Sequence, residues 1–128
     1  MSMAPHILIV DDDADIRRLV SDYLGEFNLR VSCAQDSQTM RKELAHEVVD
    51  LILLDLKLPE EDGMIIAREL RAKSSIPIIM LTSRKEDVDR IMGLELGADD
   101  YLTKPFNPDQ LMASISQYAR RNGEKSSK

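Results

Sequence analysis

The sequence has one cysteine, Cys33, and no tryptophan among its 128 residues. A single cysteine excludes a disulfide within the chain, so we expect a reducing compartment, the cytoplasm. Long hydrophobic runs are also missing. The first ten residues carry no basic segment, and their apolar run over 6–10 stops at three aspartates. We therefore predict neither a signal peptide nor a membrane span.

An excess of basic residues is lacking as well. Lys and Arg number 17 against 23 Asp and Glu, which gives a formal net charge of −6. Binding to phosphate backbones is driven by clustered Lys and Arg, so this chain is not expected to bind DNA itself. Any contact with DNA would have to come from elsewhere. With 43% hydrophobic and 31% charged residues, the composition is that of a globular domain.

Apolar strands and amphipathic helices alternate five times along the chain. The strands are predicted over 6–10, 29–33, 50–55, 76–81 and 99–102, and the helices over 13–25, 36–48, 64–70, 86–96 and 107–119. Such alternation predicts an α/β fold, a flavodoxin-like (βα)5 doubly wound parallel sheet with strand order 2-1-3-4-5. On two of these helices we expect Leu19 and Val48 to face inward. We place one domain over 1–121 and a polar tail or the start of a linker over 122–128.

Asp55 follows four apolar residues that indicate a strand buried on both faces. In the predicted order this strand lies beside the first, so Asp55 would meet Asp11 and Asp12 at one sheet edge. Three carboxylates in a small space are unfavourable without a cation, and an all-oxygen ligand set suits Mg²⁺ or Mn²⁺ better than zinc. Two alternatives stay open: a turn-forming Asp55, and acids that only favour the amino end of a helix.

Thr82 and Lys104 follow the fourth and fifth predicted strands and would reach the same edge. A carboxylate nucleophile, a metal, a lysine and a hydroxyl together suit phosphoryl transfer to the carboxylate. Taken singly, a strand-end threonine is more often a turn residue and a lysine more often a solvated surface charge.

Four segments carry a family pattern: Val10-Asp11-Asp12-Asp13, LLDLKLP at 53–59, Met80-Leu81-Thr82-Ser83 and GADDYLTKPF at 97–106. Together they resemble the marker motifs of bacterial two-component receiver domains, over about 5–121. Within that family the segment GADDYLTKPF is most similar to the OmpR/PhoB subfamily of transcriptional response regulators. Members of that subfamily usually continue into a DNA-binding domain, so the resemblance implies that DNA would be contacted only through a C-terminal domain, if this chain is a piece of a longer regulator.

The resemblance implies a role for each matching residue. It makes Asp55 the phosphoacceptor and Lys104 the phosphate-binding lysine. The metal ligands would be Asp11, Asp12, Asp55 and the Lys57 backbone carbonyl. Thr82 and Tyr101 would form the switch pair, and the bond from Lys104 to Pro105 would be cis.

The resemblance also implies a surface for homodimerisation on phosphorylation, formed by the fourth helix, fifth strand and fifth helix. Its predicted residues are Arg90, Ile91, Leu94, Asp99, Asp100, Ala113 and Arg121. Gln110 and Ser114 depart from the subfamily pattern, which has charged residues there. Lys57 and Arg84 stand two residues beyond Asp55 and Thr82, where the family tunes the lifetime of the acyl phosphate.

The function that this resemblance implies is a phosphorylation-activated receiver, which takes a phosphoryl group from a sensor histidine kinase onto Asp55. It would not be an enzyme beyond Mg²⁺-dependent self-phosphorylation and self-dephosphorylation. One alternative is a stand-alone receiver that acts by protein contact. Another is an Asp-nucleophile phosphohydrolase, which is disfavoured because such enzymes usually have a second Asp where Lys57 stands.

Overall fold

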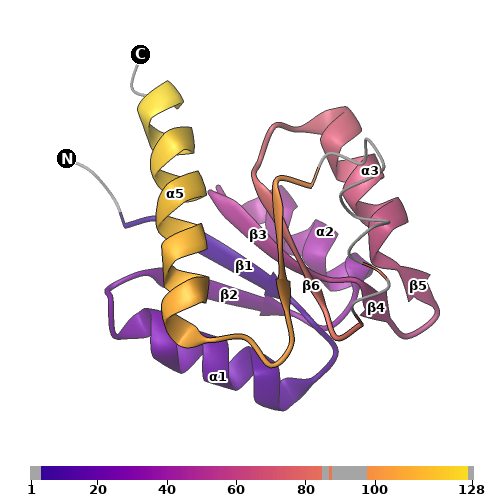
Figure 1. Cartoon of the computed structure of the whole chain (residues 1–128). Coiled ribbons are helices and arrows are strands. Elements are labelled where there is room, and N and C mark those ends of the chain that lie inside the picture. The colour runs from indigo at the N-terminus through magenta and orange to yellow at the C-terminus, as the bar shows by residue number, and fades with distance from the viewer. Residues whose placement is uncertain (1–3, 85–86, 88–97, 127–128) are drawn as a thin grey trace.

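A five-stranded parallel sheet forms the centre of the protein (Figure 1). The computed structural model describes residues 4–84, 87 and 98–126. The sheet has the order β2-β1-β3-β6-β7, which confirms the predicted order 2-1-3-4-5. Its strands are β1 (His6–Val10), β2 (Arg30–Ala34), β3 (Leu51–Asp55), β6 (Ile78–Thr82) and β7 (Asp100–Thr103).

Helices cover both faces of this sheet (Figure 1). The helices α1 (Ala14–Gly25) and α5 (Pro108–Ser126) lie on one face, and α2 (Ser37–His46) and α3 (Gly63–Lys73) lie on the other. Successive strand residues alternate between the two resulting cores: Ile52 packs toward α2 and α3, whereas Leu53 packs toward α1 and α5. No helix of the described residues is both long and apolar enough to cross a membrane.

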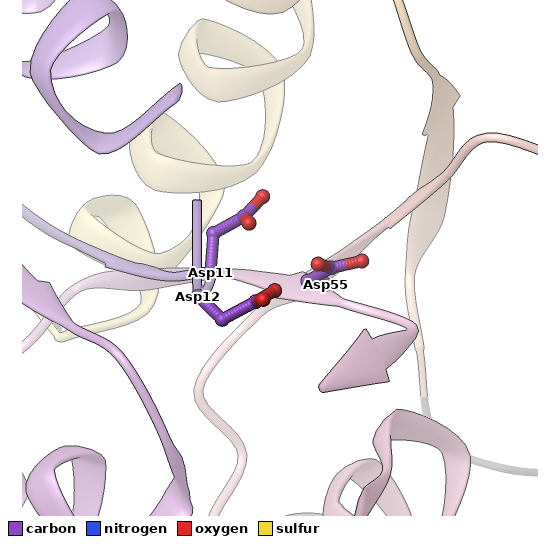
Figure 2. Close-up of side chains that lie close together, drawn as sticks. All are labelled: Asp11, Asp12 and Asp55. Carbon is purple, nitrogen blue, oxygen red and sulfur yellow. The ribbon is translucent and has the colours of Figure 1, made fainter. Parts of the chain in front are cut away.

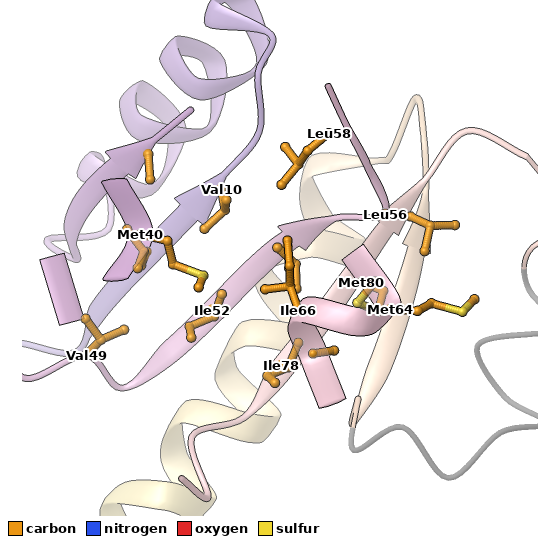
Figure 3. Packing of buried hydrophobic residues seen from close by; sticks show 14 residues of the cluster. Val10, Met40, Val49, Ile52, Leu56, Leu58, Met64, Ile66, Ile78 and Met80 are labelled. Carbon is orange, nitrogen blue, oxygen red and sulfur yellow. The ribbon is translucent and has the colours of Figure 1, made fainter. Parts of the chain in front are cut away.

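The three central strands, β1, β3 and β6, are buried along their whole length. Each large apolar side chain in them contributes about 1.5–3 kcal/mol by leaving water. Figure 3 shows one of the two cores, where Met40 of α2 and Ile66 of α3 pack against Ile52, Ile78 and neighbouring residues. This packing makes the sheet a rigid support for the residues at its carboxyl edge.

Aspartates begin three of the helices. Asp13 accepts hydrogen bonds from the first turn of α1, and Asp36 and Asp62 do the same for α2 and α3. Such caps contribute about 1 kcal/mol each because they satisfy backbone N–H groups that the helix cannot. Asp13 is therefore a cap, as the sequence predicts, and is not part of the acidic cluster.

Strand boundaries differ from the sequence prediction by one or two residues. β6 begins at Ile78, two residues later than predicted, and Pro77 before it has no N–H to donate to a neighbouring strand. β2 and β7 each lie one residue further along the chain than predicted. For β2 the position follows from pairing with β1, which aligns His6 with Arg30 and Val10 with Ala34.

Further differences concern a turn and the helices. The predicted turn after β3 contains a short antiparallel hairpin, β4 (Lys57–Leu58) and β5 (Glu61–Asp62). Leu19 is exposed by 59% and Val48 by 77%, so the expectation that they face inward is wrong. Val48 lies beyond the end of α2. The helix α5 continues through Ser126 into the predicted tail, and the predicted helix over 86–96 lies, apart from Asp87, outside the described residues.

Candidate functional site

The polar residues predicted to meet at the carboxyl edge of the sheet do so. Asp11 directly follows β1, Asp55 ends β3 and Lys104 directly follows β7. One carboxylate oxygen from each of Asp11, Asp12 and Asp55 lies within 4.8 Å of the others. Figure 2 shows the three side chains close together, with the Asp12 carboxylate directed toward Asp55. The edge is therefore a compact acidic site.

Lys104 supplies the positive charge in this site. Its Nζ donates to Asp11 Oδ2 at 2.7 Å and lies 3.4 Å from Asp55 Oδ2. Asp11 is fully buried, and its other carboxylate oxygen accepts from the Asp13 N–H at 3.0 Å. A buried carboxylate is stable only when such partners replace water. The Lys104 side chain is thus fixed over both buried acids.

Asp55 is nearly buried, with 6% of its surface exposed. Burial, together with the negative charge of Asp11, raises the pKa of Asp55 to about 6, while Lys104 and a hydrogen bond from the Lys57 N–H oppose this rise. That hydrogen bond reaches Asp55 Oδ1 at 3.2 Å. For Lys104, burial disfavours the charged form, but the hydrogen bond to Asp11 and the charges of Asp55 and Asp11 outweigh it, so the pKa of Lys104 is raised.

The raised pKa of Asp55 makes stability depend on pH. In the folded protein Asp55 binds its proton up to about pH 6, whereas its ordinary pKa is 3.8. We expect this group's contribution to stability to be full below pH 4 and lost as the pH rises through about 6, a fall of about 1–2 kcal/mol after allowance for screening by nearby water. Urea unfolding of the metal-free protein, followed by circular dichroism at several pH values, measures it. Asp55→Asn lacks the group, and a wild-type curve parallel to that of this variant would contradict the prediction.

Three carboxylates with no histidine or cysteine among them form an oxygen-only donor set. Such a set fits a hard divalent cation, and it is a poor site for zinc. The position of the Lys104 ammonium shows that positive charge is already favourable here. Asp11, Asp12 and Asp55 are therefore the residues that could bind a metal ion.

The predicted switch residues occupy different surroundings. Thr82 ends β6 and is buried, but its hydroxyl is engaged within its own turn: Oγ1 donates to the Arg84 carbonyl at 3.2 Å and accepts from the Arg84 N–H at 3.1 Å. Tyr101 lies on β7, half-buried against the core beneath α3. The bond from Lys104 to Pro105 is cis, as predicted.

Part of the predicted dimer surface lies among the described residues. Asp99 is exposed but already paired within the chain, because its Oδ2 accepts from Arg71 Nη2 at 2.9 Å and from the Ile78 N–H at 2.8 Å. Asp100 is half-buried and Ala113 is exposed. Ser114 is buried, so its side chain is not available to a partner. Arg90, Ile91, Leu94 and the side chain of Arg121 lie outside the described residues.

Sequence reasoning missed three residues that support the site. Arg17 of α1 donates to the Asp11 backbone carbonyl at 2.7 Å. Glu61 of the hairpin accepts hydrogen bonds from both the N–H and the hydroxyl of Ser37, which links the segment after Asp55 to the start of α2. Gly63 begins α3 against the backbone of Asp55 and Leu56. Only Arg17, within the first turns after the predicted cap, could have been suspected from sequence.

Comparison with known proteins agrees with this geometry. The model of the response regulator receiver domain family matches residues 7–116. The transcriptional regulatory protein AruR of Pseudomonas aeruginosa is 45% identical over 126 residues, which are 94% of this chain and 52% of AruR. The crystal structure of the receiver domain of the TMAO respiratory system response regulator TorR superposes with a TM-score of 0.85 at 38% identity, over 91% of this chain and 98% of that one.

A third relative is the BeF3-activated N-terminal receiver domain of Klebsiella pneumoniae RstA. It is 36% identical, with a TM-score of 0.82 over 90% of this chain and 98% of that one. The chain spans about half the length of the curated relatives that it matches. The family match covers most of the chain and includes the acidic edge described above. The chain therefore belongs to the response regulator receiver domain family of two-component systems.

Proposed function

We propose that Asp55 accepts the phosphoryl group from a sensor histidine kinase, with Mg²⁺ or Mn²⁺ bound by Asp11, Asp12, Asp55 and the Lys57 carbonyl. The observation that carries this proposal is the nearly buried Asp55 carboxylate between two further acids and the Lys104 ammonium. A bound divalent ion would neutralise charge on the transferred group. The location that we propose is the cytoplasm, in keeping with the single cysteine.

The residues of this chain would act on the transfer in separate ways. A carboxylate oxygen of Asp55 attacks the phosphorus atom, the bond from phosphorus to the kinase histidine breaks, and the imidazole leaves with a proton from solvent. Lys104, now on Asp11 and Asp55, would shift to the phosphoryl oxygens, which carry more negative charge. The Thr82 hydroxyl would donate to the same group after leaving its turn. The shift of Thr82, with Tyr101 turning inward, would report phosphorylation.

We further propose that the chain is the receiver, over 1–121, of an OmpR/PhoB-type transcriptional regulator. The similarity to AruR, a transcriptional regulatory protein of about twice this length, supports this proposal. Phosphorylation would then control dimerisation through Arg90, Ile91, Leu94, Asp99, Asp100, Ala113 and Arg121, and DNA would be bound by a separate domain. For Asp99, joining a partner would require release of Arg71.

Intact mass after incubation with acetyl phosphate tests the proposal. We expect one phosphoryl adduct that forms with Mg²⁺ and not after chelation, and that borohydride reduction with peptide mapping assigns to Asp55. Light scattering on the same samples measures the dimer. An adduct without a dimer would keep the phosphoacceptor and favour a receiver that acts by contact with another protein. No adduct, or an adduct on another residue, would reject the phosphoacceptor role.

Lys57→Ala should change the lifetime of this adduct. The Lys57 side chain is exposed and leaves the backbone two residues after Asp55, whereas the N–H that reaches Asp55 Oδ1 would remain in the variant. Removing the side chain therefore leaves this backbone contact in place and takes away the positive charge and the shielding from water that the side chain could give the phosphoryl group. We expect a severalfold change in the decay rate, measured as loss of adduct mass after the donor is removed. Lys73→Ala, at the exposed end of α3, is the matched control, and identical decay of all three proteins would discard the idea.

A further inference from the structure

Arg17 is the fourth residue of α1, and its side chain reaches back over the start of that helix. Helical side chains lean toward the amino end, which allows this direction. Its Nη1 donates to the Asp11 backbone carbonyl at 2.7 Å. Arg17 is half-buried in this position, whereas Arg18, the next residue, is exposed. The two arginines differ in surroundings although they share a helix and a charge.

The bond from Arg17 completes a set that holds every polar group of Asp11. The Asp11 N–H donates to the Ala34 carbonyl at 3.0 Å, and its two carboxylate oxygens accept from the Asp13 N–H and from Lys104. Of these groups, only the carbonyl belongs to the peptide that joins Asp11 to Asp12. Because a peptide is planar, holding its carbonyl also fixes the orientation of the N–H and Cα of Asp12.

Asp12 has no comparable support of its own. Its side chain is exposed, and within the described part of the chain no hydrogen bond or ion pair holds its carboxylate. Nevertheless that carboxylate lies within 4.8 Å of those of Asp11 and Asp55 (Figure 2). The direction in which Asp12 points therefore depends on the peptide plane that Arg17 fixes.

We propose that Arg17 is a positioning residue of the divalent-cation site. By holding the Asp11 carbonyl, Arg17 orients the Asp12 carboxylate toward the metal. The inference rests on the metal site of the proposed function. If Arg17 positions Asp12, its loss should weaken metal binding. If Arg17 acted only through its charge, its loss should instead strengthen metal binding, because a guanidinium near three acids repels a cation. A merely structural role predicts lower stability with unchanged metal affinity. The three roles are thus separable by measurement.

The test is the Mg²⁺ dissociation constant from calorimetry, without any phosphodonor, for wild type, Arg17→Met, Arg17→Lys and Arg18→Met. Methionine keeps much of the length and removes charge and donors, whereas lysine keeps the charge and one donor group. We expect Arg17→Met to weaken Mg²⁺ binding about tenfold, as loss of an outer-shell partner does. Arg17→Lys should recover part of the affinity, and Arg18→Met should bind like wild type. In adduct formation, Arg17→Met should need more Mg²⁺ for half the maximal rate while the maximal rate changes little.

Tighter Mg²⁺ binding by Arg17→Met would overturn the positioning role and show that Arg17 acts on the site through its positive charge. Unchanged affinity in both Arg17 variants, with only the thermal midpoint lowered, would reduce Arg17 to a structural residue. Should Arg17→Met fail to fold, Arg17→Lys still tests the role, because the shorter lysine side chain reaches the Asp11 carbonyl less well than Arg17 does. Equal Mg²⁺ affinities of Arg17→Lys and wild type would then reject the role. If wild type binds no Mg²⁺, the metal site itself is rejected, an outcome distinct from the others.

Discussion

Asp55→Asn should form no phosphoryl adduct at all, because the amide oxygen is not a nucleophile that can make an acyl phosphate. The same change should raise the free energy of unfolding of the metal-free protein at neutral pH by about 1–2 kcal/mol, since it removes a carboxylate that is ionised there despite its burial. Function and stability therefore move in opposite directions. Intact mass measures the first effect, and urea unfolding with and without Mg²⁺ measures the second.

Two other aspartates provide controls for this substitution. Asp22→Asn changes an exposed carboxylate of α1 outside the acidic cluster and should leave the adduct unchanged. Asp12→Asn keeps the acceptor but removes one acid of the cluster, so the adduct should still form at higher Mg²⁺ concentration. Wild-type levels of adduct in Asp55→Asn, or its loss in Asp22→Asn, would contradict the assignment of Asp55.

Gly63→Ala should lower the free energy of unfolding by about 2–3 kcal/mol, in the range of other overpacking substitutions. A Cβ at Gly63 would lie 2.5 Å from the Asp55 carbonyl oxygen, 2.7 Å from Leu56 Cα and 2.8 Å from the Leu56 carbonyl oxygen. All three are backbone atoms, which cannot rotate away, and the Gly63 N–H also donates to the Leu56 carbonyl at 2.7 Å. The backbone beside Asp55, the proposed phosphoacceptor, would have to move, so we also expect slower adduct formation.

Gly25→Ala is the matched control for Gly63→Ala, because Gly25 also lies at a helix end. Nothing lies within 4 Å of a Cβ at Gly25, and its backbone does not require glycine. This variant should be as stable as wild type or up to about 1 kcal/mol more stable. Urea unfolding by circular dichroism suits the comparison, since the protein has no tryptophan. Equal stability of the two variants would contradict the role assigned to the close packing at Gly63.

The sheet could be predicted because its central strands carry the information locally. The runs around Leu53 and Ile79 are apolar without alternation and end at polar residues, a pattern that few structures other than a buried parallel strand produce. The convergence of Asp11, Asp55 and Lys104 then followed from the strand order alone. These parts of the site are consequences of topology.

The remaining features depend on contacts that sequence patterns do not record. The β4–β5 hairpin has strands of only two residues, too short for any periodicity, and Glu61 bonds to Ser37 across 24 residues of sequence. The exposure of Leu19 depends on how α1 sits against its neighbours, which a helical repeat does not specify. Likewise, the need for glycine at 63 arises only once α3 has docked on the backbone of Asp55.

If Thr82 acts as the proposed switch, the turn that engages its hydroxyl would set a threshold for signalling. Two hydrogen bonds with Arg84 hold this hydroxyl; at a net value of about 1 kcal/mol each, they bias it about thirtyfold toward the turn. A group at Asp55 must therefore favour the hydroxyl released from Arg84 over the hydroxyl bonded to Arg84 by more than about thirtyfold. Only then does the released state predominate. Ligands that offer only weak acceptors would leave most molecules in the resting state. The turn would then make the response depend on the strength of the hydrogen-bond acceptor at Asp55 as well as on occupancy of the site.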